Sequence, residues 1–167
     1  MQSQHDRQLQ ELSGPRVRRD PVLRADLQEL LRSSIDSRHR LGEAASLVET
    51  DSIRVLLSSA ADRRWKHERS LGRILQEYDV EVPEHGTFAG MMHRNWLAFR
   101  ALLNFGHPVV VLIEARRGER RMSELCDQAL ERVEDPGIEA LLKSHKQHIS
   151  ETRWKIESLL QLDSLLN

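Results

Sequence analysis

Residues 51–78 read DSIRVLLSSAADRRWKHERSLGRILQEY, and this stretch decides the fold class. Its side chains repeat at alternating three- and four-residue steps, the spacing that brings side chains to one face of an α-helix. That face consists of Ile53, Leu57, Ala60, Arg64, His67, Leu71, Ile74 and Tyr78. Because the face is apolar at both ends and polar at its centre, the stretch predicts a long helix that carries two polar side chains into a core.

Three other stretches of the chain repeat this pattern. Their faces run from Leu27 to Val48, from Leu112 to Val133 and from Ile138 to Leu160. Two of these helices are predicted to begin at Asp20-Pro21 and Asp135-Pro136, because aspartate caps a helix N-terminus and proline suits the first helical position. We therefore predict four long helices and an all-α fold.

The connection between the second and third predicted helices is long. Val80 to Gly86 carries turn signals, a shorter helical pattern follows from Thr87 to Leu103, and Gly106-His107-Pro108 ends it. A single long crossover is typical of ferritin-like bundles. We expect a ferritin-like four-helix bundle with a short extra helix in the crossover over residues 21–167, and a mobile polar tail over residues 1–20.

The composition excludes several classes of protein. Charged residues make up 31% of the chain and aromatic residues 4%, which suits a helical bundle better than a β-sandwich. The formal net charge of -1 gives no overall field that would attract nucleic acid or acidic lipid, so we predict neither as a partner. The single cysteine, Cys126, excludes an intrachain disulfide and fits a reducing compartment.

Two further features favour the cytoplasm. The first residues contain no apolar run, so we expect no secretory signal. The longest nearly uncharged stretch, Ala101 to Ile113, is interrupted by Asn104, Gly106 and Pro108 and is too short to span a bilayer. We therefore expect a cytoplasmic protein without membrane contact.

Each predicted helix face carries polar side chains near its middle. They are Arg38, Arg64, His67, Glu119, His145 and Arg153 (or Thr152). Di-iron and di-manganese bundles build their sites at this height, from one glutamate on each of two helices and a Glu-x-x-His pair on each of the others. The sequence contains no Glu-x-x-His, and arginine stays protonated and has no lone pair for a metal. We therefore predict no metal and no cofactor.

Three interpretations of this polar layer remain open. In the first, which we adopt, Glu119 pairs with one of the three arginines in a salt-bridged layer that fixes the register of the helices. In the second, His145, His148 and Glu119 bind a metal. In the third, the arginines hold an anion.

The crossover carries a family resemblance. Residues 86–96 read GTFAGMMHRNW and are similar to the Gly-Ser/Thr-x-Ala-Gly-x-x-His-Arg-x-Trp stretch of a bacterial family of ferritin-like four-helix-bundle proteins classed as a domain of unknown function. Glu114 to Glu119 resembles the family's third helix, and Leu27 to Ala45 resembles its first. The resemblance covers about residues 23–162 and implies the same fold.

The chain departs from the family pattern in the polar layer. Ser37 to Arg40 stand where the family has acidic residues and glycine, and the second helix lacks the family's glutamate next to Arg63. Cys126 replaces a tyrosine, and Arg153 replaces a histidine. These departures weaken the interpretation as a metal enzyme.

Several aromatic and basic side chains are candidates for contact with a partner. His93, Arg94 and Trp96 form a candidate partner surface, or they dock the short crossover helix on the bundle. Trp65 and Trp154 lie beside the helix faces and either seal the bundle or meet a second copy of the chain. Because the C-terminus has more leucines than one helix face can bury, we predict a homodimer.

The sequence thus favours a non-enzymatic bundle that acts through contact with an unidentified protein or with a second copy of itself. The alternative is a metal-binding or redox ferritin-like protein with a remodelled site. Acidic residues at positions 38, 63 or 153 would favour the alternative, and arginine stands at all three. The place of Cys126 on the third helix face predicts an inert buried thiol.

Overall fold

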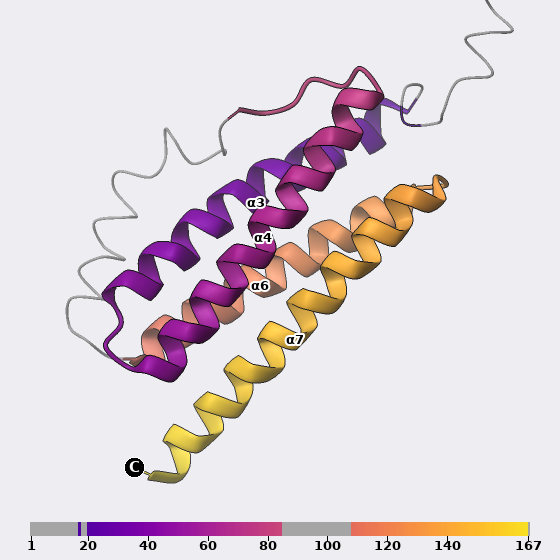
Figure 1. The fold of residues 1–167 in the computed structure, drawn as a ribbon. Coiled ribbons are helices and arrows are strands. Elements are labelled where there is room, and N and C mark those ends of the chain that lie inside the picture. The colour runs from indigo at the N-terminus through magenta and orange to yellow at the C-terminus, as the bar shows by residue number, and fades with distance from the viewer. Residues whose placement is uncertain (1–16, 18–19, 85–107, 167) are drawn as a thin grey trace, which may run out of the picture.

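The computed structural model describes residue 17 and residues 20–84 and 108–166, and its long helices form a bundle (Figure 1). Four α-helices and no strands occur in these ranges, which confirms the predicted all-α class. The helices are α3 (Pro21–Leu47), α4 (Asp51–Glu77), α6 (Pro108–Leu130) and α7 (Pro136–Leu166). The predicted short crossover helix lies outside the described residues, as does the N-terminal tail apart from residues 17 and 20.

Both predicted aspartate caps are present. The side chain of Asp20 accepts hydrogen bonds from the backbone N–H groups of Val22 and Leu23, at 2.9 and 3.0 Å. Asp135 does the same for the first turn of α7, where it accepts from Gly137 and Ile138. It also accepts a hydrogen bond of 2.7 Å from the Tyr78 hydroxyl, so the cap ties the end of α4 to the start of α7.

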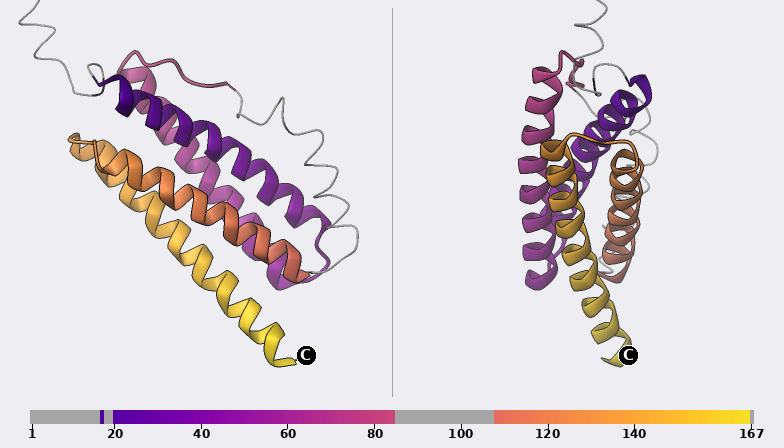
Figure 2. Two further views of the ribbon diagram at one scale, coloured as in Figure 1. Left: turned by 180° about the vertical axis from the view of Figure 1, so that it is seen from behind. Right: turned by 90° about the vertical axis from the view of Figure 1, so that its right-hand side faces the viewer.

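The helices occupy the corners of a square, with α3 packed against α4 and α6, and α7 packed against the same two helices. All neighbouring pairs are antiparallel, whereas the diagonal helices α4 and α6 run in the same direction (Figures 1 and 2). The end of α4 and the start of α6 therefore lie at opposite ends of the bundle. This arrangement brings the middle of all four helices to one level.

The apolar core is divided into two clusters by that level. One cluster lies at the end where α3 and α7 begin, and its largest buried side chains include Leu23, Leu27, Leu30, Leu75, Met122, Ile138 and Leu142. The other lies at the opposite end and includes Leu41, Ile53, Leu57, Val111, Leu112 and Ile156. Each fully buried side chain of this size contributes about 1.5–3 kcal/mol, so both ends hold the bundle together.

The outer surface is charged, with a few exposed apolar side chains. Among the described residues, large side chains of this kind are Val22, Val55, Trp65, Trp154 and Leu162, from α3, α4 and α7. No described helix contains a stretch long and apolar enough to cross a lipid bilayer.

Candidate functional site

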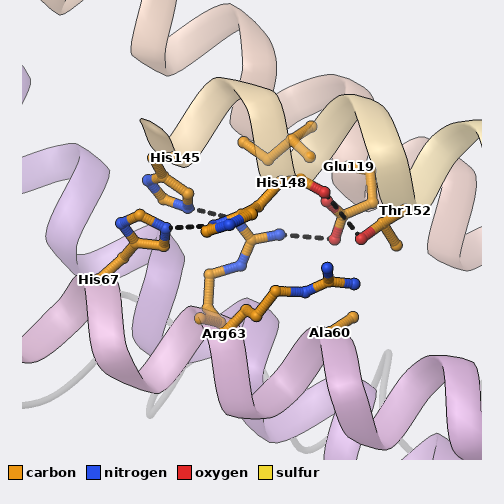
Figure 3. A pocket seen from close by; sticks show the side chains of 9 residues that line it. Ala60, Arg63, His67, Glu119, His145, His148 and Thr152 are labelled. Atoms are coloured by element: carbon orange, nitrogen blue, oxygen red, sulfur yellow. Dashed lines mark hydrogen bonds and ion pairs between the residues drawn. The ribbon is translucent and has the colours of Figure 1, made fainter. Parts of the chain in front are cut away.

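A buried ion pair lies at the centre of the bundle. Arg64 of α4 is 3% exposed and Glu119 of α6 is 1% exposed, and the Arg64 Nη2 donates to the Glu119 Oε1 at 2.5 Å. The pair joins the two diagonal helices across the core (Figure 3). Of the three arginines considered as partners of Glu119, Arg64 is therefore the one in contact with it.

Arg64 also determines the protonation of His145. Its Nη1 lies 2.5 Å from the His145 Nε2. Because a guanidinium group only donates hydrogen bonds, the Nε2 must be the acceptor, and the proton of the neutral ring is on Nδ1. That Nδ1 faces the Cys126 Sγ at 3.8 Å. Burial, followed by the charge of Arg64, holds the pKa of His145 well below its usual value.

His67 completes a stack of imidazole rings. Its ring is stacked on that of His145, with centroids 4.2 Å apart, and its Nε2 lies 2.9 Å from the Nδ1 of His148. Burial lowers the pKa of His67 to about 4, and repulsion from His148 and Arg64 acts in the same direction. His67 and His145 are thus uncharged at neutral pH, which leaves the Arg64–Glu119 pair electrically balanced.

A cavity of about 10 Å³ lies beside the pair. It is lined by Ala60, Arg63, Arg64, His67, Glu119, His145, His148, Ile149 and Thr152 (Figure 3). The Nε of Arg64 and the Nε and Nη2 of Arg63 are buried without a hydrogen-bond partner among the described residues. The volume suits one water molecule and is far below the several hundred Å³ that an organic ligand needs.

Arg38 lies at the edge of the polar layer rather than at its centre. Its Nε contacts both carboxylate oxygens of Glu68, at 2.9 and 3.0 Å, and its side chain is 30% exposed. Ser34 and Ser37 occupy the inward positions of α3.

In α7, the inward position belongs to Thr152, which is 2% exposed, whereas Arg153 is half-buried. The pairing of Glu68 with Arg38 was missed by the sequence analysis, although Glu68 lies next to His67 on the edge of the α4 face. The candidate partner residues His93, Arg94 and Trp96 lie outside the described residues.

The donor set of this layer does not suit a metal ion. The described part of the chain contains no group of three or more histidine, cysteine, aspartate or glutamate side chains arranged to hold a metal. The Oε1 of Glu119 and the Nε2 of His145 both accept from the guanidinium group of Arg64. A cation there would have to displace a fixed positive charge.

Residues 23–132 match the family model described as a domain of unknown function (DUF2383). No curated protein matches the chain.

We predict that Glu119→Gln destabilises the protein by about 3–5 kcal/mol, because it leaves the positive charge of Arg64 buried without a carboxylate. The matched control is Glu124→Gln on the same helix, whose side chain is 49% exposed and pairs with Arg120. That change should stay within about 1 kcal/mol. Equal denaturant midpoints for the two variants would contradict the role of the pair.

We predict that stability falls as the pH drops from 6.5 towards 4. The unfolded chain takes up protons on His67 and His145 near their usual pKa of 6.5, whereas the folded protein takes them up at lower pH. For His67 alone the loss at pH 4 is on the order of 3 kcal/mol. Denaturation curves at pH 7 and pH 5 should differ less for His67→Gln than for wild type.

Proposed function

The chain belongs to the family described as a domain of unknown function (DUF2383), and we propose that it is a non-catalytic helical bundle of ferritin-like topology that acts by binding another protein chain, including a second copy of itself. The parallel diagonal pair α4 and α6, separated by residues 78–107, supports the ferritin-like topology. Among four-helix bundles, one long crossover distinguishes ferritin-like folds from simple up-and-down bundles.

The observation that carries the proposal is the position of Arg64. In ferritin-like metal proteins, carboxylates and imidazoles converge on the bundle centre. Here the side chain of Arg64, which is 3% exposed, lies at the bundle centre, and the carboxylate of Glu119 neutralises its charge. The adjacent cavity, which is lined by described residues, has room for one water and is too small for an organic substrate.

The buried thiol supports the same view. Cys126 is fully buried, and burial raises its pKa to about 12. A thiol with so high a pKa is protonated at neutral pH and is a poor nucleophile. The high pKa therefore favours a structural role for the Cys126 thiol over a catalytic one.

The exterior carries the features of a contact surface. Trp154 is 70% exposed and Trp65 45% exposed, and tryptophan is enriched among the residues that dominate the binding energy of protein interfaces. The last turns of α7 diverge from the other helices, and Leu162 on them is 57% exposed (Figures 1 and 2). These side chains gain from burial against another chain.

We predict that the protein binds no stoichiometric iron, manganese or zinc. The test is elemental analysis of untagged protein expressed in medium supplemented with all three metals, followed by dialysis. A stoichiometric metal that is lost in Glu119→Ala would contradict the proposal and favour the metal-binding alternative. A control variant at Glu124→Ala separates a specific loss from a general effect of removing a carboxylate.

We predict a two-fold dimer in solution, because two-fold dimers are the commonest closed assembly and α7 exposes a large aromatic side chain. Light scattering should return twice the chain mass of 19.4 kDa. Trp154→Ser should shift the equilibrium to the monomer, whereas Val55→Ser on α4 should leave it unchanged. A monomer at high protein concentration would exclude self-association.

A further inference from the structure

A groove of about 340 Å³ lies on the outer side of the bundle between α3 and α4. Leu31 and Ile35 of α3 and Gly72 of α4 line its apolar part, and Val82 lies at its end. A Cβ atom added at Gly72 would meet the Val82 Cγ1 at an ordinary contact distance of 3.8 Å. The glycine therefore leaves room in the groove without being needed for the backbone conformation.

One wall of the groove is aromatic and positively charged. Trp65, Arg69 and Arg73 follow one another at four-residue steps on one side of α4, so their side chains lie one above another. The Arg69 guanidinium carbon lies 4.9 Å from the centre of the Trp65 ring, and all three residues are exposed.

Within residues 20–84 and 108–166, the two arginines of this wall have no carboxylate partner. No described residue forms an ion pair with Arg69 or Arg73. The carboxylate that lines the groove, Glu68, is already bound by Arg38 from the opposite wall. The groove thus combines apolar lining residues with the positive charges of Arg69 and Arg73, which no described carboxylate neutralises.

We propose that this groove binds an amphipathic helical segment of a partner protein that carries both acidic and apolar side chains. The inference rests on the proposed function and names the chemistry of the partner. An apolar side chain would cover the half-buried Ile35 and Val82, while carboxylates would bind the guanidinium groups of Arg69 and Arg73. Grooves between helices bind amphipathic helices in this way.

Charge and polarity favour this occupant over others. Residues 85–107 of the chain itself contain no aspartate or glutamate, so they cannot neutralise the two arginines. Nucleic acid would meet the positive charges but would leave the apolar lining residues without a counterpart, and the chain has a net charge of -1. An acidic, amphipathic peptide satisfies both parts of the groove.

The test uses a fluorescein-labelled synthetic peptide of about four helical turns, with leucine on one face and glutamate on the other. Fluorescence anisotropy should show that it binds wild-type protein and that added salt weakens the binding. Arg69→Glu combined with Arg73→Glu should reduce affinity about tenfold or more. Gly72→Leu, which fills the groove, should also abolish binding and should leave the thermal stability at or above that of wild type.

The matched control is Arg120→Glu combined with Arg121→Glu, which reverses two exposed charges on α6, a helix that does not line the groove. This variant should bind the peptide as wild type does. Two further probes are the peptide with glutamine in place of glutamate and a single-stranded oligothymidine. Both should bind more weakly than the acidic peptide.

Four results would overturn the proposal: no binding of the peptide, equal loss in the α6 control, equal binding of the glutamine peptide, or tighter binding of the oligonucleotide. If Gly72→Leu instead splits a dimer seen by light scattering, the groove holds a second copy of the chain and the peptide proposal is wrong. These binding results test the peptide proposal alone. The proposed function is tested separately by elemental analysis, and a stoichiometric metal would contradict it.

Discussion

The structure depends on the neutralisation of one buried positive charge. A guanidinium group cannot release its proton, so Arg64 in the core requires a carboxylate at hydrogen-bonding distance, and Glu119 supplies it. The remaining donors of Arg64 then impose the tautomer of His145, and His67 stacks on that ring. The charge of Arg64 adds to the effect of burial in lowering the pKa values of His67 and His145, and a water-sized cavity lies beside it.

Helical periodicity was sufficient to predict the core of the site. The three- and four-residue steps of α4 place Arg64 and His67 on the same face as Leu57 and Leu71, and the structure has all four buried. The N-caps Asp20 and Asp135 could also be predicted from the sequence, because capping is local and depends only on the next few residues.

Periodicity could not predict which side chains at the edge of a helix face point into the core. Successive residues on a helix are about 100° apart, so two neighbours can both lie near the inward direction. Arg153 and Thr152 are adjacent candidates for one inward position of α7, and in the structure Thr152 is buried whereas Arg153 is half-buried. Arg38 has a long side chain that can reach either the core or the edge, and its choice of Glu68 depends on the distance between α3 and α4. The positions of these side chains are determined by the tertiary structure.

The polar layer between two apolar clusters affects the stability of bundles in which the helices pack in a shifted register. If α6 slid along α4 by one helical turn, about 5.4 Å, the apolar clusters would still find apolar neighbours, and the loss of hydrophobic contact would be modest. Arg64 would then lie against Ala115 or Met122 instead of Glu119 and would be buried without a counter-charge. The ion pair therefore discriminates against shifted bundles, including bundles assembled from helices exchanged between two chains, for which the apolar side chains alone provide little selection.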